Sequence, residues 1–257
     1  MYDTLRPELL TATPGQRRMM QNDPTAVVSF ELFRVNQYPY LEVRRPFILG
    51  TAERTWRPTL SHFFLRVLHE KGMLQRIYTQ NIDGLDYQLG LPEEKVIPVH
   101  GSIGTVSCEA CGAPEGMAYF RDAVKGNIKD IYNIDASAPK ESTPVQCRQC
   151  GQPALKPSTV LYGRSLPAHF FKSAPKDMAA TDVMLIIGTS LTVQPAASLP
   201  DQLPPLSAKV LVNRDQVRSA YMASWRASST RRLHPPPNDR DSCTLTPHTL
   251  HSTPLFR

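Results

Sequence analysis

The chain has 257 residues, of which 41% are hydrophobic and 20% are charged, and its formal net charge is +6. This length and composition fit one globular unit with a smaller lobe. The longest apolar run, Val183 to Ile187, has five residues, far fewer than the roughly 20 of a membrane-spanning helix. No membrane partner is therefore expected.

The positive charge is concentrated at the carboxyl-terminal end. Residues 216–257 contain six Arg and two Asp, so four of the six net positive charges lie there. The same segment has five Pro, three His and the unpaired Cys243, and it has no Gly or Lys. This composition predicts a disordered basic tail. Because the rest of the chain is nearly balanced in charge, direct nucleic-acid binding is not favoured.

The amino-terminal part is expected to be helical. Short apolar clusters such as Val27 to Phe33 are interrupted by Pro and Asn and predict short helices in the first fifty residues. The clearest helix follows Pro58, where five apolar residues repeat at helical spacing before Gly72 ends the pattern. These residues are Leu60, Phe63, Phe64, Val67 and Leu68. The apolar stripe that they form requires a sheet to cover it.

Five short runs rich in β-branched residues follow, separated by turns or helices. They are Arg76–Thr79, Val96–Val99, Ser158–Tyr162, Val183–Ile187 and Lys209–Val212. This alternation predicts an α/β fold with a parallel sheet, in which ligands bind at the carboxyl ends of the strands. Polar, small or ionisable residues follow four of the runs: Gln80–Asp83, His100–Ser102, Gly188–Ser190 and Asn213–Asp215.

These strand ends suggest a nucleotide site, although each motif alone is weak. A Gly-Thr-Ser turn leaves space for phosphate to approach backbone N–H groups, and Asn213 could bond a ribose hydroxyl. A Gly-x-Ser after a strand is more often an ordinary turn, and a single His is more often structural. His100 is a stronger candidate because it lies at a strand end, beside Gly101 and directly before a cysteine-rich segment.

Two Cys-x-x-Cys pairs, Cys108 with Cys111 and Cys147 with Cys150, predict one structural zinc site. Disulfides are the alternative, but the chain opens without a secretory pattern, so an oxidising compartment is not indicated. The segment between the pairs, residues 112–146, is rich in Gly, Pro and charge. We expect it to bury little core by itself and to be held folded by the metal.

Six motifs carry a resemblance to a known family. In chain order they are Tyr78–Asp83, Val99–Ser102, the two cysteine pairs, Leu155–Gly163, Gly188–Pro195 and Leu211–Asn213. Their order and spacing resemble the sirtuins, the NAD-dependent protein lysine deacylases. The resemblance implies a Rossmann-like parallel sheet domain with a smaller helical plus zinc-ribbon module.

The resemblance also implies the domain boundaries. Residues 1–215 would form a sirtuin-type catalytic domain, with a helical module at 3–56 and a zinc-binding module at 103–156. The family's first strand and its Gly-rich turn have no counterpart in this domain. Residues 216–257 would be the basic tail.

The resemblance assigns expected roles to individual residues. His100 would be the general base, and the four paired cysteines would bind Zn²⁺. The NAD contacts would be Gln80, Asn81, Ile82, Asp83, Gly188, Thr189, Ser190, Asn213, Arg214 and Asp215. The substrate contacts, which pair with the peptide backbone and enclose the acyl-lysine, would be Val160, Leu161, Tyr162, Gly163 and Val193.

The expected function is therefore NAD-dependent protein lysine deacetylation, in which the acetyl group is transferred to ADP-ribose and nicotinamide is released. Acetylated proteins would be the partners. One alternative is a catalytically inactive, sirtuin-like interaction protein, which would be folded and zinc-loaded without turnover. Another is a zinc-ribbon nucleic-acid-binding protein, which explains the cysteines and the tail but gives His100 no role. The expected compartment is the cytoplasm, or alternatively the nucleus, because thiolates need a reducing environment.

Overall fold

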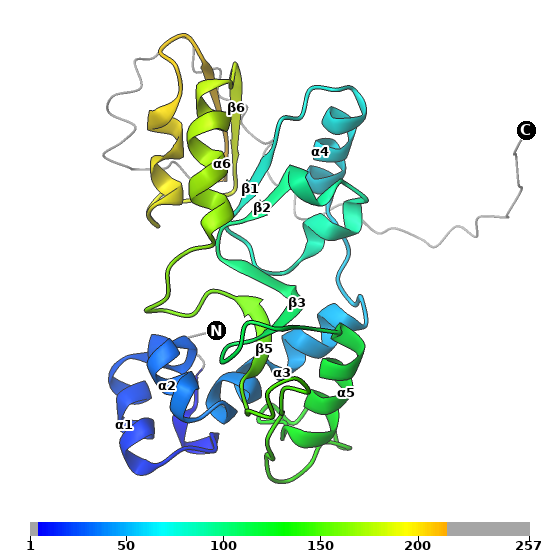
Figure 1. Ribbon diagram of the computed structural model, residues 1–257, viewed down its shortest axis with the longest axis vertical. Helices are drawn as coiled ribbons and strands as arrows, with labels where there is room; N and C mark the ends of the chain where they lie inside the picture. Colours follow the sequence, from blue (N-terminus) through cyan, green and yellow to red (C-terminus); the bar gives the residue numbers. More distant parts are fainter. Residues whose placement is uncertain (1–4, 215–257) are drawn as a thin grey trace, which may run out of the picture. The chain divides into compact units, whose positions relative to one another are not determined.

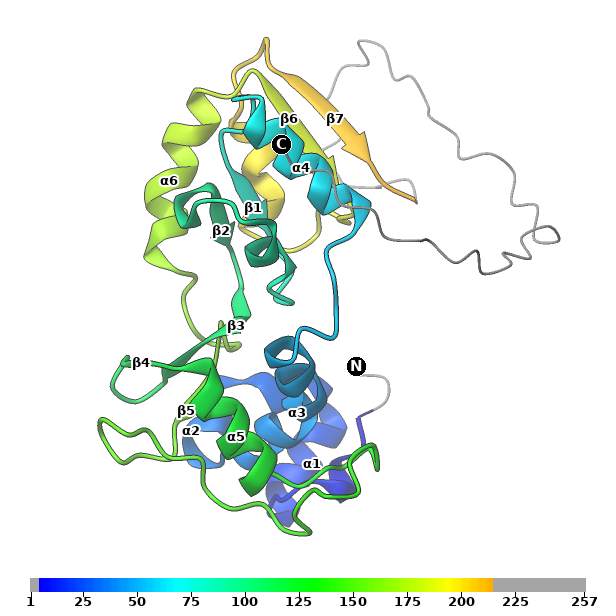
Figure 2. The ribbon, with the colours of Figure 1, turned by 90° about the vertical axis from the view of Figure 1, so that its right-hand side faces the viewer.

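The computed structural model describes residues 5–214 (Figures 1 and 2). The expected tail at 216–257 and the candidate NAD contact Asp215 lie outside the described residues. Within residues 5–214, no helix is long and apolar enough to cross a membrane.

The first elements are helical, as the sequence predicted. They are the 3-10 helices η2 (Pro7–Leu9) and η3 (Pro24–Val28) and the α-helices α1 (Pro14–Asn22), α2 (Phe30–Val35) and α3 (Tyr38–Ala52). Side chains fix where these helices begin: Thr13 accepts the N–H of Gln16 before α1, and Ser29 accepts the N–H of Leu32 before α2. Helix α3 is buried along much of its length and forms the centre of a large hydrophobic core.

The cysteine-rich region is built on an antiparallel sheet. Strands β3 (Gly101–Cys108), β4 (Pro114–Glu115) and β5 (Leu155–Thr159) lie in the order β4-β3-β5, and helix α5 (Met117–Asn127) packs beside α3. Two expectations were wrong here. The segment 112–146 does contribute to the core, because Phe120 and Val124, one helical turn apart in α5, and Val145 are fully buried. The run Ser158–Tyr162 is not a parallel strand, since the strand lies three residues earlier and is antiparallel to β3.

The remaining strands are parallel and form two pairs. Strand β1 (Ile77–Thr79) pairs with β2 (Val96–Pro98), and β6 (Val183–Ile187) pairs with β7 (Ala208–Val212). Short 3-10 helices η4 (Leu85–Leu89), η5 (Glu93–Lys95) and η6 (Ala196–Gln202) lie in the connections. Helix α6 (Ala168–Ala179) packs on both pairs through a second core that includes Phe170, Tyr78 and Met184. These parallel strands and helices confirm the predicted α/β fold class.

Helix α4 (Leu60–Glu70) agrees with the sequence prediction in its position, and Gly72 ends it with a φ of 70°. Its packing does not agree. No residue of α4 is buried, and its apolar stripe lies largely exposed. Within residues 5–214, the expected sheet does not cover this helix.

Candidate functional site

The four paired cysteines come together at one point. Their sulfur atoms all lie within 4.8 Å of one another, with Cys108 and Cys150 separated by 3.7 Å and Cys111 and Cys147 by 3.8 Å. Zinc–sulfur bonds of about 2.3 Å in a tetrahedron place the sulfurs about 3.8 Å apart. The cluster therefore fits one structural zinc ion, and its spacing is too wide for disulfides.

Both cysteine turns have the same backbone geometry. The N–H of Gly112 donates to the carbonyl of Cys108, and the N–H of Gly151 donates to the carbonyl of Cys147. Both glycines have positive φ, 74° and 72°, which glycine adopts without steric cost. The N–H of Cys150 lowers the pKa of the Cys147 thiol to about 7, which favours the thiolate form that binds metal.

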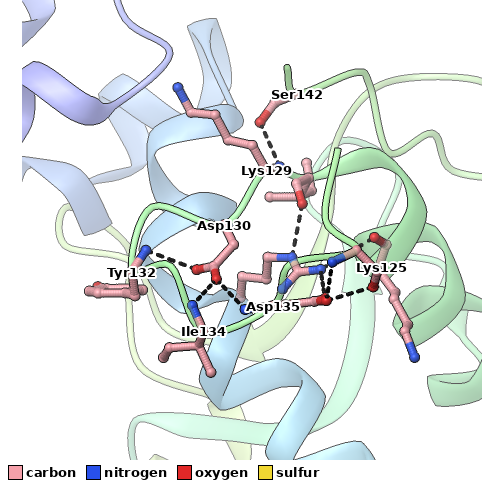
Figure 3. Close-up of polar contacts among 10 residues, drawn as sticks. Lys125, Lys129, Asp130, Tyr132, Ile134, Asp135 and Ser142 are labelled. Atoms are coloured by element: carbon pink, nitrogen blue, oxygen red, sulfur yellow. Dashed lines mark hydrogen bonds and ion pairs between the residues drawn. The ribbon is translucent and has the colours of Figure 1, made fainter. Parts of the chain in front are cut away.

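The loop between the cysteine pairs is fixed to α3. The carboxylate of Asp130 accepts the backbone N–H groups of Tyr132, Ile134 and Asp135 (Figure 3). The guanidinium of Arg45, which α3 supplies and which is only 3% exposed, pairs with Asp135 at 2.6 Å. Buried polar contacts therefore hold this loop in addition to the cysteine cluster.

His100 lies immediately before β3 and close to the loop that follows β1. Its Nδ1 is 3.2 Å from the carbonyl oxygen of Gln80. Because a carbonyl only accepts hydrogen bonds, this contact requires the proton on Nδ1 and leaves Nε2 as the basic nitrogen. The carbonyl of His100 also accepts the N–H of Val160, which ties it to the end of β5.

The next residue, Gly101, is required by close packing. Its φ is 75°, and a Cβ at this position would overlap the carbonyl oxygen of Ser158 and lie 2.8 Å from the Cα of Thr159. The adjacent strand β5 therefore approaches β3 at a distance that only glycine permits. This contact fixes the start of β3 and, with it, the backbone of His100.

The predicted residues Gln80–Asp83 lie beside His100. Besides the bond from His100 to Gln80, the N–H of Ile103 donates to the carbonyl of Ile82 at 2.7 Å. The carboxylate of Asp83 accepts the N–H of Leu85 at 3.0 Å, which fixes the turn into η4. The structure therefore brings together two motifs that are about twenty residues apart.

Sequence reasoning missed one ionisable residue near this loop. Asp86 is 5% exposed, and its burial raises the pKa of its carboxyl group, while the electrostatic influence of His62 opposes the shift. The only hint in the sequence was the pair of acidic residues in Asp-Gly-Leu-Asp, residues 83–86. That pattern does not reveal burial, because burial depends on how η4 packs.

A second group of predicted residues meets at the ends of β6 and β7. The N–H of Gly188 donates to the carbonyl of Val212, and the side-chain amide of Asn213 donates to the carbonyl of Thr189 at 3.3 Å. Gly188 has a φ of 62°, and no atom lies within 4 Å of the place where a Cβ would be. The turn is therefore open enough for a ligand to approach its backbone. Arg214 is the last described residue after β7.

The expected substrate segment, Val160–Gly163, follows β5 and ends in a turn, in which the N–H of Arg164 donates to the carbonyl of Leu161 and Gly163 has a φ of 87°. Tyr162 donates its N–H to the carbonyl of Val28 and accepts the N–H of Phe30, so both of its backbone groups face the helical region. Val193 comes from the separate segment after β6, and its side chain is 49% exposed.

Comparison with known proteins decides the family. The Sir2 family model matches residues 16–195. The chain belongs to the Sir2 family. The NAD-dependent protein deacetylase hst2 of Schizosaccharomyces pombe is 36% identical over 196 residues, which are 76% of this chain and 53% of hst2. The NAD-dependent protein deacetylase sirtuin-3 of Mus musculus is 35% identical over 194 residues, which are 76% of this chain and 52% of sirtuin-3. The chain thus spans about half the length of these relatives.

Most of the predicted site lies inside the stretch that matches the Sir2 family. Gln80–Asp83, His100, the four paired cysteines, Val160–Gly163, Gly188–Ser190 and Val193 all fall within residues 16–195. Asn213 and Arg214 lie beyond the match, so their roles rest on their position at the end of β7.

Proposed function

We propose that this Sir2 family member is an NAD-dependent protein lysine deacetylase, which transfers the acetyl group of a protein substrate to ADP-ribose and releases nicotinamide. Membership in the family supports the proposal, and so do the names of the relatives described above, which are NAD-dependent protein deacetylases. Acetylated proteins are the partners that this activity requires.

One observation carries the proposal. His100 is oriented by the Gln80 carbonyl so that Nε2 is its basic nitrogen. A histidine fixed in one tautomer beside a polar strand end has the geometry of a general base. Gln80 is also the first of the residues expected to contact nicotinamide and its ribose. The proposed base and the nicotinamide half of the NAD site are therefore joined by a hydrogen bond.

The other residues have supporting roles. Bound NAD would supply the ADP-ribose acceptor and the nicotinamide leaving group. Gln80–Asp83 would hold the nicotinamide and its ribose, whereas Gly188–Ser190, Asn213 and Arg214 would hold the phosphate and adenosine-ribose portion. His100 would take a proton at Nε2 from a ribose hydroxyl.

The peptide would bind along Val160–Gly163, and Val193 would help to enclose the acyl-lysine. Backbone pairing of this kind tolerates many peptide sequences. Arg164, which follows this segment, donates to the carboxylate of Glu109 at 2.8 Å and stacks 4.3 Å from the ring of Phe30. Its charge is therefore already paired and is not expected to select acidic substrates.

The test is an acetyl-peptide assay at saturating NAD that measures nicotinamide release. We expect His100→Ala to lower turnover by about 10²–10⁴-fold, the usual range for a general base, without changing zinc content. The matched control is His169→Ala, which removes an exposed histidine of α6 and should change turnover by no more than about twofold. Near-normal turnover in His100→Ala, or acetyl release that does not require NAD, would contradict the proposal.

A second candidate function is a non-catalytic protein that binds acetylated partners. The observation that favours it is the separation of the expected NAD contacts onto two strand pairs, which form no ladder with each other within residues 5–214. It predicts folded, zinc-loaded protein that binds acetyl-peptide and releases no nicotinamide. The same assay therefore distinguishes the two candidates.

We also propose a reducing compartment, cytoplasm or nucleus, because zinc requires the cysteines as thiolates. Imaging of the tagged protein tests this proposal. An exclusively secreted or lumenal protein would contradict it.

A further inference from the structure

Glu109 connects the cysteine cluster to the end of the expected substrate segment. It follows Cys108, the last residue of β3, and its N–H donates to the carbonyl of Ala154 at 2.8 Å. Its side chain is only 14% exposed, and its two carboxylate oxygens contact different cations. One oxygen lies 3.2 Å from the ammonium of Lys156, and the other accepts from Arg164 at 2.8 Å. A single carboxylate therefore bridges β5 and the turn that ends the substrate segment.

Lys156 fixes this carboxylate in place. Its ammonium is 3% exposed and donates to the carbonyls of Pro157 and Thr159 at 3.1 and 2.6 Å. Burial lowers the pKa of Lys156, and the charge of Glu109 opposes this shift. A buried charge that loses its partner is strongly destabilising. Glu109 is therefore held by Lys156 independently of its contact with Arg164.

Arg164 is the exposed member of the cluster. Its side chain is 49% exposed, and its guanidinium lies 4.3 Å from the centre of the Phe30 ring. Phe30 begins α2 and donates its N–H to the carbonyl of Tyr162. The guanidinium is thus held on the side of the segment that the helical region covers. Without Glu109, this long side chain would be free to extend its charged end into solvent.

We propose that Glu109 is a specificity-determining residue, which holds Arg164 against Phe30 and so prevents the substrate segment from selecting acidic residues beside the acetyl-lysine. The inference rests on the proposed function, because that function assigns peptide binding to Val160–Gly163. A free guanidinium at the rim of a peptide site attracts carboxylates, and rim charges decide partner choice more than strength. With Arg164 held, peptides with acidic and with uncharged flanking residues bind alike.

Glu109 acts through the position of Arg164 and touches neither the peptide nor the reacting atoms. One carboxylate faces two cations, so the effect depends on where the guanidinium is held and not on full neutralisation. The consequence is a change in peptide binding, seen in Kd and KM, with kcat unchanged. Because an attraction between exposed charges is screened by salt, a released Arg164 also makes peptide binding depend on ionic strength.

The test compares two fluorescein-labelled acetyl-lysine peptides that differ only at the two residues flanking the acetyl-lysine, Asp in one and Asn in the other. Binding to the full 257-residue chain is measured by fluorescence anisotropy without NAD, so that it does not require turnover. We expect the unmodified chain to bind both peptides within about twofold. Glu109→Gln should bind the Asp peptide about three- to fivefold more tightly than the Asn peptide, near the upper end for an exposed ion pair. This preference should disappear at about 0.5 M salt.

Three further variants separate charge from structure. Glu109→Gln combined with Arg164→Gln should lose the preference for Asp, because the released guanidinium is its cause. Arg164→Gln alone should bind both peptides as the unmodified chain does, and it leaves the contact between Glu109 and Lys156 intact. The matched control is Glu115→Gln, which breaks the ion pair with Arg148 in the same cysteine-rich region and should create no preference. Zinc content and circular dichroism confirm that the variants are folded.

Several results would overturn the proposal. A preference for Asp that persists in the double variant means that Glu109 acts on the shape of the segment. Equal binding of the two peptides by folded, zinc-loaded Glu109→Gln means that Arg164 does not reach the peptide. Arg164→Gln alone decides against the proposal, even where Glu109→Gln does not fold, if it weakens Asp-peptide binding more than about threefold. Binding of neither peptide up to about 1 mM removes the assigned segment and the inference with it. Peptide binding with the expected preferences but no nicotinamide release on addition of NAD contradicts only the deacetylase proposal.

Discussion

Replacement of one zinc ligand tests the structural role of the metal most directly. We choose Cys111→Ser because Cys111 is the exposed member of the cluster, whereas Cys108 and Cys147 are buried in the core. Loss of an exposed thiol removes little packing. A large effect of this substitution therefore reports on metal binding rather than on a cavity.

The expected magnitude follows from the geometry. The sulfur separations of 3.7 and 3.8 Å match a zinc tetrahedron without rearrangement. Structural zinc of this type has an apparent binding free energy of about 10–16 kcal/mol. The whole stability of a domain is only about 5–15 kcal/mol. Loss of the metal is therefore expected to unfold the cysteine-rich region, and with it the core that Cys108 and Cys147 share with Leu155 and Phe120.

The assay combines metal analysis with thermal unfolding. We expect one zinc per unmodified chain, clearly less in Cys111→Ser, and a melting temperature at least about 10 °C lower, since each kcal/mol is worth about 2–4 °C in a domain of this size. Cys243→Ser, which changes a cysteine outside both pairs, is the control and should retain one zinc. Metal-free protein that melts like the unmodified chain would refute the reasoning.

Two further substitutions test the packing around the site. Gly101→Ala should destabilise the chain by about 3 kcal/mol in urea unfolding, because the new side chain combines a positive φ with a clash at Ser158. The control, Gly126→Ala in α5, has open space around it and should be neutral or stabilising. Equal effects of the two substitutions would contradict the clash. Arg45→Ala should destabilise the chain by about 2–3 kcal/mol, because it removes a side chain that is only 3% exposed and leaves the carbonyl of Ile128 without its donor. Arg121→Ala, in an exposed pair, should cost less than about 1 kcal/mol. Similar losses in the two variants would show that burial does not matter here.

Local sequence predicted the parallel strands well. The run Val183–Ile187 was predicted residue for residue, because five consecutive apolar residues lie between Asp182 and Gly188. The site at the strand ends followed from the same reasoning. The bond between His100 and Gln80 confirms that the ends of β1 and β2 meet.

The sequence prediction placed strand β5 three residues too late, because tertiary contacts decide its position. It contains Lys156 and Pro157, two residue types with low β-strand propensity. Pro157 is tolerated next to an irregularity in the pairing with β3. The Lys156 ammonium donates to the carbonyl of Thr159 at 2.6 Å and pairs with Glu109, which is distant in sequence. A single sequence does not reveal such partners.

The zinc site and His100 lie at opposite ends of the same pair of strands. Cys108 ends β3 opposite Leu155 of β5, and the metal would bind Cys108 together with Cys150, five residues before Leu155. At the other end, the N–H of Val160 donates to the carbonyl of His100. A slip of one residue in such a ladder turns every side chain to the other face. Zinc with four sulfur ligands has no open position for chemistry, yet by fixing this register it determines where His100 lies.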